Sequence, residues 1–150
     1  MSIHYVNCDE RLKIQIGMVM GTTAERHLHV TDGFTIIALD EEQPVGIIAV
    51  YPRSLPAPLS ETIEWYIDII EVVPLYRRHG IARRLVAMAI ERVGKEGAYQ
   101  LRAWSSEDKL EAIPMWKALG FGLCPATVYP QGQEVRGFYV TYPIPKRYFA

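Results

Sequence analysis

Apolar and polar positions along this 150-residue chain repeat with two different periods, and each change of period marks a new element. Runs rich in β-branched and aromatic residues predict strands at residues 2–7, 34–39, 45–51, 62–73, 98–104, 121–129 and 135–142. Apolar side chains three or four positions apart predict helices from Asp9 to about 20, Thr22 to 29, Ile81 to about 94, and Ser105 or Ser106 to about 119. This order of elements predicts an α/β (α+β) fold with one mixed sheet and helices on its faces.

Three segments refine this prediction. The strand at residues 62–73 is almost continuously apolar, which is typical of a central strand covered on both faces. Residues 52–60 hold three prolines and are expected to form a surface loop. Pro114 falls inside the last predicted helix and is expected to bend or break it.

The composition narrows the class of protein. Apolar residues make up 49% of the chain and charged residues 22%, as in globular domains, and the length predicts a single domain over residues 1–150. The net charge of −1 gives no general argument for binding nucleic acid or an anionic membrane. The two cysteines lack metal or redox spacing, and the chain starts without a signal-peptide pattern, so we expect a cytoplasmic protein with reduced thiols.

The most informative segment is the basic turn that follows the strand ending at Pro74. The pattern Arg-x-x-Gly-x-Ala, from Arg77 to Ala82, lies between that strand and the start of the next predicted helix. The free N–H groups and the positive dipole end of a helix N-terminus favour an anion at this position. Gly80 allows close approach of the backbone to a ligand. The segment therefore predicts a pyrophosphate cradle and a nucleotide-bearing cofactor.

Two runs of residues carry a resemblance to a known family. The first is Val72-x-Pro74-x-Tyr76-Arg77-x-x-Gly80-Ile81-Ala82-x-x-Leu85, and the second is Ala112-Ile113-x-x-Trp116-x-x-Leu119-Gly120-Phe121. They resemble the acetyl-CoA motif and the second motif of the GNAT N-acetyltransferase superfamily, and the element order matches across essentially the whole chain. The resemblance implies a mostly antiparallel sheet of about seven strands flanked by about four helices.

The resemblance also implies how acetyl-CoA would bind as the acetyl donor. Pantetheine would lie between the strands at residues 62–73 and 98–104, paired with backbone groups near Ile70 and Val72. The pyrophosphate would be held by backbone N–H groups, with charge added by the arginines, at Arg77, Arg78, His79, Gly80, Ile81, Ala82 and Arg83. No metal is expected, because the pair His27-x-His29 has no third ligand nearby in the sequence.

The central strand supplies three candidate bases, since an alkylammonium must lose a proton before it attacks a thioester. Glu71 and Asp68 rank first, and Glu64 follows them. Glu64 and Asp68 have the same parity and share a face, whereas Glu71 faces the other side unless a bulge intervenes. The alternative role for each is a structural ion pair, for example with Arg102. Three acids near the acceptor would favour a cationic substrate.

The acid that protonates the leaving thiolate has no obvious candidate. The related enzymes often use a tyrosine in the second motif, and here that position is Trp116, whose indole N–H donates a hydrogen bond but is not an acid near neutral pH. Tyr129, Tyr139 or solvent are the alternatives, and both tyrosines also suit ordinary strand positions. Lys109 stands where the motif often has asparagine.

The predicted activity is acetyl transfer from acetyl-CoA to a primary amine by direct attack in a ternary complex. A polyamine, an aminoglycoside, an amino acid and a peptide N-terminus all fit as acceptors, and a longer acyl group is the nearest enzymatic alternative. A rival from another class is a CoA-binding module with weak or no catalysis, acting as a sensor or partner subunit. A homodimer through residues 135–142 or the tail 143–150 is a further alternative.

Overall fold

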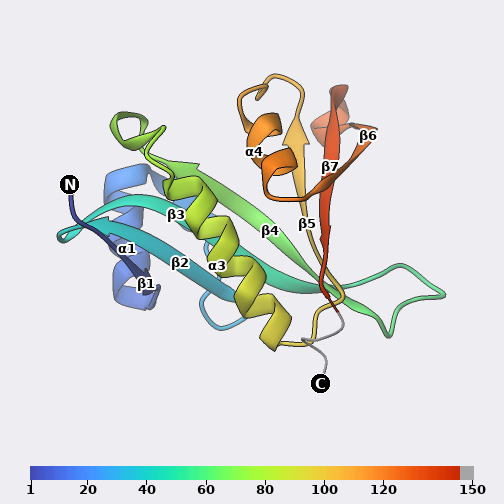
Figure 1. The fold of residues 1–150 in the computed structure, drawn as a ribbon, viewed down its shortest axis with the longest axis horizontal. Coiled ribbons are helices and arrows are strands. Elements are labelled where there is room, and N and C mark those ends of the chain that lie inside the picture. The colour runs from blue at the N-terminus through green and yellow to red at the C-terminus, as the bar shows by residue number, and fades with distance from the viewer. Residues whose placement is uncertain (146–150) are drawn as a thin grey trace.

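A twisted sheet runs through the whole computed structural model, which describes residues 1–145 (Figure 1). Its strand order is β1-β2-β3-β4-β5-β7-β6. Among these strands, only the β4–β5 pair is parallel. The predicted seven-stranded, mostly antiparallel sheet is confirmed, with strands β1 Ile3–Asn7, β2 Phe34–Asp40, β3 Gln43–Ser54, β4 Ile63–Val72, β5 Gln100–Ser106, β6 Gly122–Val128 and β7 Val135–Pro143.

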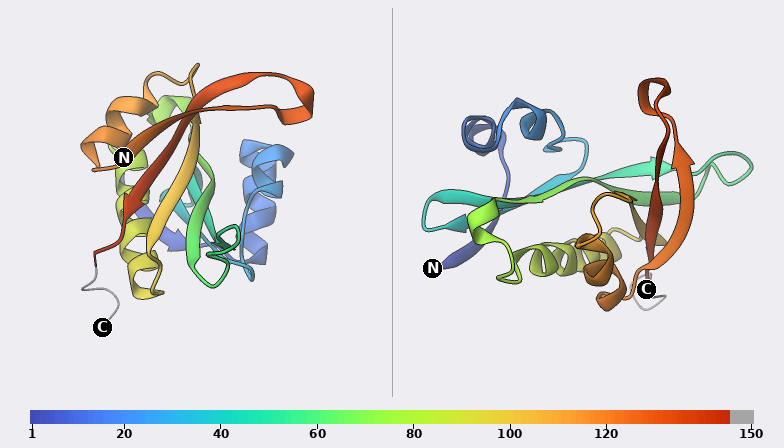
Figure 2. Two further views of the ribbon diagram at one scale, coloured as in Figure 1. Left: turned by 90° about the vertical axis from the view of Figure 1, so that its right-hand side faces the viewer. Right: turned by 90° about the horizontal axis from the view of Figure 1, so that it is seen from above.

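Helices cover both faces of the sheet. Helices α1 (Glu10–Met20) and α2 (Thr22–Arg26) lie on one face, and α3 (Ile81–Lys95) and α4 (Ala112–Ala118) lie on the other (Figure 2). Two short 3₁₀ turns, Pro74–Tyr76 and Pro130–Gly132, complete the fold. In residues 1–145 this confirms the prediction of about four helices, and none of them is long and apolar enough to cross a membrane.

The predicted helix patterns explain how these faces are buried. Asp9 caps α1, since its carboxylate accepts a hydrogen bond from the N–H of Leu12 at 2.8 Å. The stripe of α3 predicted to be apolar packs on the sheet as the larger core, at Ile81, Leu85, Ala89 and Val93. A smaller core under α1 and α2 contains Ile16, Ile37 and Ile47. Helix α3 is thereby fixed with its N-terminus just beyond the end of β4.

Three sequence predictions were wrong in detail. Strand β3 runs to Ser54, into the predicted loop, because Pro52 to Ser54 pair with the start of β4. Ser105 and Ser106 do not cap a helix, because they pair with β7 as the end of β5. Helix α4 therefore begins at Ala112, and Pro114 lies in its first turn, where a missing N–H costs no hydrogen bond.

The edges of the sheet also differ from expectation. Strand β7 lies between β5 and β6, so residues 135–142 do not form an edge and cannot extend the sheet to a second copy. The free C-terminal edge belongs to β6, which contains Pro125. The other predicted dimer contact was the tail at residues 143–150, of which residues 146–150 lie outside the described residues.

The parallel pair β4–β5 is short and opens at one end. Its register contains Trp65 with Leu101, Tyr66 with Arg102, and Ile67 with Ala103. Strand β4 then continues to Val72 and β5 to Ser106 with no further pair between these two strands, which diverge in the ribbon view (Figure 1). The predicted separation of these strands is thus present beyond Ile67.

A buried ion pair fastens the closed end of this opening. The Glu64 side chain is only 1% exposed, and its two carboxylate oxygens accept hydrogen bonds from Arg102 Nε at 2.9 Å and Nη2 at 2.6 Å. Gln100 Nε2 donates a further bond to Glu64 at 2.9 Å. The hydrogen bonds to Glu64 raise the pKa of the Arg102 guanidinium. Glu64 thus joins β4 to β5 as a satisfied buried charge.

Replacing Arg102 by Met should destabilise the fold by about 3 kcal/mol, because the buried Glu64 carboxylate then loses its counter-charge. Urea unfolding of the purified variant measures the loss. The matched control is Arg53→Met, because Arg53 lies opposite Glu64 in the register but contacts the Tyr66 ring instead, and its loss should be about 0.5–1 kcal/mol. Adding Glu64→Gln to Arg102→Met should recover stability. Equal losses for the two arginine variants would contradict the structural role of the pair.

Candidate active site

Beyond Ile67 one edge of β4 has no partner strand within residues 1–145, and of its Val72 groups the carbonyl accepts a hydrogen bond from Arg77. The N–H of Val73 donates to the carbonyl of Val45 at 2.8 Å, so this residue bonds toward β3. Backbone groups alternate between the two edges of a strand, so those of Ile70 and Val72 face β5, where no strand pairs with them. The two sequence-predicted pantetheine contacts therefore lie on the free edge.

The turn after β4 has the geometry of an anion cradle. Arg78 and Gly80 adopt left-handed conformations, with φ of 65° and 80°. In residues 1–145 no side chain caps the N-terminus of α3, and a Cβ built on Gly80 would meet nothing within 4 Å. The first turn of α3 therefore offers free N–H groups to open space. Because these N–H groups are free and the space in front of them is open, the predicted residues fit a pyrophosphate group.

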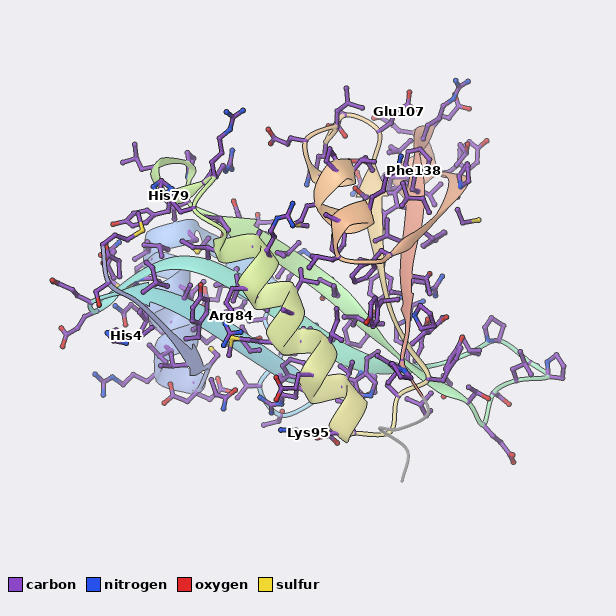
Figure 3. The ribbon with its side chains drawn as sticks, viewed as in Figure 1. His4, His79, Arg84, Lys95, Glu107 and Phe138 are labelled. Carbon is purple, nitrogen blue, oxygen red and sulfur yellow. The ribbon has the colours of Figure 1, made fainter. Side chains whose placement is uncertain are left out.

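Hydrogen bonds from side chains hold this loop in place. Arg77 Nε donates to the Val72 carbonyl at 3.0 Å, and His79 Nδ1 donates to the Arg77 carbonyl at 2.9 Å. The Tyr76 hydroxyl donates to Asp40 Oδ2 at 2.6 Å, which lowers the pKa of the Asp40 carboxyl and raises that of Tyr76. Arg77 is thus bonded through Nε to the end of β4, and its phosphate contact stays a prediction. His79 lies on the exposed turn before α3 (Figure 3), and Arg78 is also exposed.

A β-bulge in β4 rearranges the predicted bases. In the β3–β4 register Ala49 pairs with Ile69 and Val50 pairs with Ile67, so Asp68 is the extra residue. The bulge shifts the parity of the strand, and Glu71 lies opposite Ile47, a member of the core under α1. Asp68 and Glu71 therefore share the face covered by α1 and α2, the outcome that the sequence allowed only if a bulge intervened.

Asp68 is surrounded by a titratable network. Its Oδ2 lies 2.8 Å from His29 Nε2, and its Oδ1 lies 3.2 Å from His27 Nδ1. The other nitrogen of His29, Nδ1, lies 2.8 Å from Asp32 Oδ2, and this hydrogen bond lowers the pKa of Asp32. The His29 ring stacks on Tyr51 with centroids 4.5 Å apart. The four titratable side chains form one chain of contacts, His27–Asp68–His29–Asp32.

The structure separates the three predicted bases. Glu64 is used by Arg102 and is buried, Asp68 lies at the centre of the histidine network, and Glu71 is exposed near the end of β4. Sequence reasoning missed the role of the two histidines, because their contact with Asp68 spans about 40 residues of chain. The His-x-His spacing was the available signal, but it suggested only a metal. Within residues 1–145, no three His, Cys, Asp or Glu side chains are placed to hold one.

Trp116 occupies the second-motif position in an unusual state. It is 2% exposed, packs edge-on against Phe121 with centroids 4.8 Å apart, and its indole N–H has no hydrogen-bond partner in the described part of the chain. Of the alternative acids, Tyr139 packs against Trp104 and beneath Arg102, and Tyr129 is 64% exposed. Tyr139 therefore has a structural packing role, and Trp116 keeps an unused donor.

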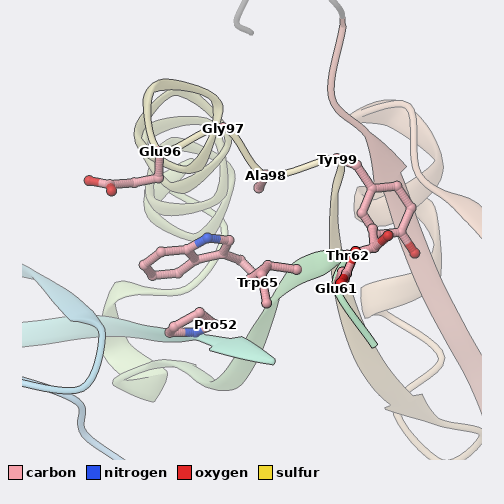
Figure 4. A pocket seen from close by; sticks show the side chains of 9 residues that line it. Pro52, Glu61, Thr62, Trp65, Glu96, Gly97, Ala98 and Tyr99 are labelled. Atoms are coloured by element: carbon pink, nitrogen blue, oxygen red, sulfur yellow. The ribbon is translucent and has the colours of Figure 1, made fainter. Parts of the chain in front are cut away.

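Two surface pockets lie elsewhere. One of about 400 Å³ sits at the closed end of β4, between Trp65, Pro52, Glu96 and Tyr99 (Figure 4). The other, of about 600 Å³, lies between β1 and α3 and includes Tyr5, Arg84 and Arg92. Neither contains a residue predicted for the cofactor loop up to Arg83 or for the bases. These pockets therefore do not mark the predicted site, most of which lies on β4 beyond Ile67 and on the turn that follows it.

Solved structures of transferases share this fold. Arabidopsis thaliana NAA60, in complex with a bisubstrate analogue, matches with a TM-score of 0.76 at 16% identity over 95% of this chain and 98% of that chain. An Escherichia coli N-acetyltransferase for a ribosomal-protein alanine matches with a TM-score of 0.74 at 16% identity, covering 95% and 94%. An aminoglycoside 6'-N-acetyltransferase complexed with coenzyme A matches with a TM-score of 0.73 at 16% identity, covering 97% and 98%.

Two comparisons use the amino-acid sequence rather than the fold. Among curated protein sequences no match is found. The sequence model described as the acetyltransferase (GNAT) family matches residues 9–121, a span that contains the histidine network, the β4 edge, the cradle and Trp116. Because this match covers most of the chain and agrees with the fold and the loop geometry, the protein belongs to the acetyltransferase (GNAT) family.

Proposed function

We propose that this protein transfers the acetyl group of acetyl-CoA to a primary amine by direct attack in a ternary complex. The observation that carries the proposal is the free edge of β4 leading directly into the uncapped N-terminus of α3. An extended amide chain suits the free edge of β4, and a pyrophosphate suits the N-terminus of α3. We also propose that the chain, residues 1–150, is a single domain.

The proposed cofactor contacts follow from this arrangement. Backbone groups of Ile70 and Val72 would pair with pantetheine, while the pyrophosphate would be held by backbone N–H groups at Arg78, His79, Gly80, Ile81, Ala82 and Arg83. Acetyl-CoA supplies an activated acetyl thioester when it binds. A backbone N–H on the free edge near Val72 would stabilise the oxyanion that develops on the acetyl oxygen.

The acceptor side is proposed to be the face that carries Asp68 and Glu71. The β6–β7 hairpin curves toward the side of the sheet on which α1 and α2 lie (Figure 2). The two carboxylates on this face favour a cationic acceptor, and proton removal is assigned to the Asp68 network, with Glu71 contributing charge. Glu64 is a weaker candidate, because its oxygens are already bonded to Arg102 and Gln100.

A CoA-binding module with weak or no catalysis, acting as a sensor or partner subunit, is the second candidate function. The indole N–H of Trp116, which has no hydrogen-bond partner among residues 1–145, favours it, because related enzymes often place tyrosine at this position. An indole supplies a donor but no proton to a leaving thiolate. The two candidates differ in one observable: both bind acetyl-CoA, but only the enzyme releases free thiol when amines are added.

Gly80→Ala should weaken acetyl-CoA binding about tenfold, because its Cβ enters the space in front of the cradle. Gly97→Ala is the matched control: it also replaces a left-handed glycine (φ 77°) with open space around it, but at the other end of α3. Both variants carry a similar backbone strain of about 1–2 kcal/mol. Titration calorimetry with acetyl-CoA separates them, and equal affinity for the two variants would refute the location of the cradle.

Asp68→Asn should lower turnover about 100-fold, since the network loses its central carboxylate. Glu71→Gln should instead raise the KM of cationic amines severalfold with a smaller effect on kcat. The measurement is thiol release with acetyl-CoA and a panel of polyamines, aminoglycosides, amino acids and peptides. Glu42→Gln, at an exposed turn, is the charge-matched control. Wild-type protein that binds acetyl-CoA but acetylates none of these amines would favour the CoA-binding module.

A further inference from the structure

We propose that His27 is the catalytic base that takes the proton from the acceptor amine, and that Asp68 is the residue that positions it. This inference rests on the proposed function and refines it, because the carboxylates of β4 then act through an imidazole rather than directly. The observation behind it is the contact between His27 Nδ1 and Asp68 Oδ1 at 3.2 Å.

The contact selects the tautomer that a base needs. An ionised carboxylate only accepts hydrogen bonds, so His27 must carry a hydrogen on Nδ1 to donate to Asp68. In neutral His27 the lone pair then lies on Nε2, at the outer side of the ring. The His27 side chain is 47% exposed, so a ligand can reach it. The imidazolium that forms on proton uptake lies next to a carboxylate, as in the histidine–aspartate pairs of hydrolases.

The contacts of His29 fix the position of the Asp68 side chain. Its second oxygen is bonded to His29, whose side chain is only 13% exposed and stacks on Tyr51. The backbone of His29 is fixed by Thr35, whose hydroxyl accepts from the His29 N–H at 3.0 Å and donates to the His29 carbonyl at 2.8 Å. Both ring nitrogens of His29 are engaged, Nε2 with Asp68 and Nδ1 with Asp32. It is therefore an anchor, and His27 is the exposed end.

The pair is placed where the chemistry is proposed to occur. Asp68 directly follows Ile67, the last β4 residue that pairs with β5, so it stands at the start of the opening. The charged and titratable groups around the pair are His29 and Asp32 from the segment before β2, with Lys13 of α1 acting on Asp32 from a longer distance. His27 itself ends α2, on the face assigned to the acceptor.

The proposed step is balanced in protons and electrons. His27 Nε2 takes one proton from the ammonium group and leaves a neutral amine. The amine nitrogen attacks the acetyl carbonyl carbon, a C–N bond forms, and the C–S bond breaks with the electron pair on sulfur. The second amine proton neutralises the thiolate, directly or through water, and the His27 imidazolium returns its proton to solvent.

The test compares His27→Gln with the matched variant His4→Gln. His4 is exposed on β1 at the far edge of the sheet (Figure 3). We expect His27→Gln to lose about 100-fold in kcat with its acetyl-CoA affinity unchanged. The acidic limb of its kcat/KM profile against pH should also disappear. In His27→Ala, added imidazole should restore activity. His4→Gln should match the wild type. Wild-type turnover and pH profile in His27→Gln would overturn the inference.

A second measurement separates this inference from the proposed function. Histidine ¹⁵N NMR of the intact protein, assigned with His27→Gln, reports the tautomer without any turnover. We expect neutral His27 to carry its hydrogen on Nδ1 and to lose this preference in Asp68→Asn. A hydrogen on Nε2 in the wild type overturns the role of His27, whatever the activity. Failure of the wild type to acetylate any amine, with the expected tautomer present, overturns the proposed function instead.

Discussion

The interaction on which the rest of the structure depends is the short parallel ladder between β4 and β5. It holds through Ile67 and then stops, although both strands continue. The Glu64–Arg102 pair closes one end, so the strands diverge only toward the other. Backbone donors and acceptors left free inside a sheet are costly unless something pairs with them. The free edge of β4 beyond Ile67 therefore has the geometry that suits an extended polar chain as a pairing partner.

The sheet separates two kinds of chemistry by its two faces. Helix α3 packs on one face and directs its N-terminus to the end of β4, so fixed backbone dipoles gather there. The other face carries the ionisable side chains, and the bulge at Asp68 adds Glu71 to it. A single irregular residue in β4 thus sets which carboxylates share this face, whereas the turn before α3 is shaped by its backbone conformation and by the side chains that bond to it.

The sequence predicted the fold well because it depends on local signals, and the same local signals carry the cofactor-loop residues, which stay a prediction. The α3 stripe, Gly80 and the order of elements can be read within short windows. The network at Asp68 could not be predicted, because it joins His27 and His29 to a residue about 40 positions away. The start of α4 was misplaced because Ser105 and Ser106 suit a cap, but pairing with β7 determines their state. The bulge was an open alternative, since only the register with β3 reveals it.

The left-handed turn at Arg78 and Gly80 has a kinetic consequence. These conformations are present before any ligand arrives, and bonds from Arg77, His79 and Tyr76 hold the loop in place. The conformational entropy needed to shape the cradle is therefore lost during folding rather than at binding. An anionic ligand that bound a loop of this shape would need no loop closure, so its association rate would be set by diffusion and by the surrounding positive charge.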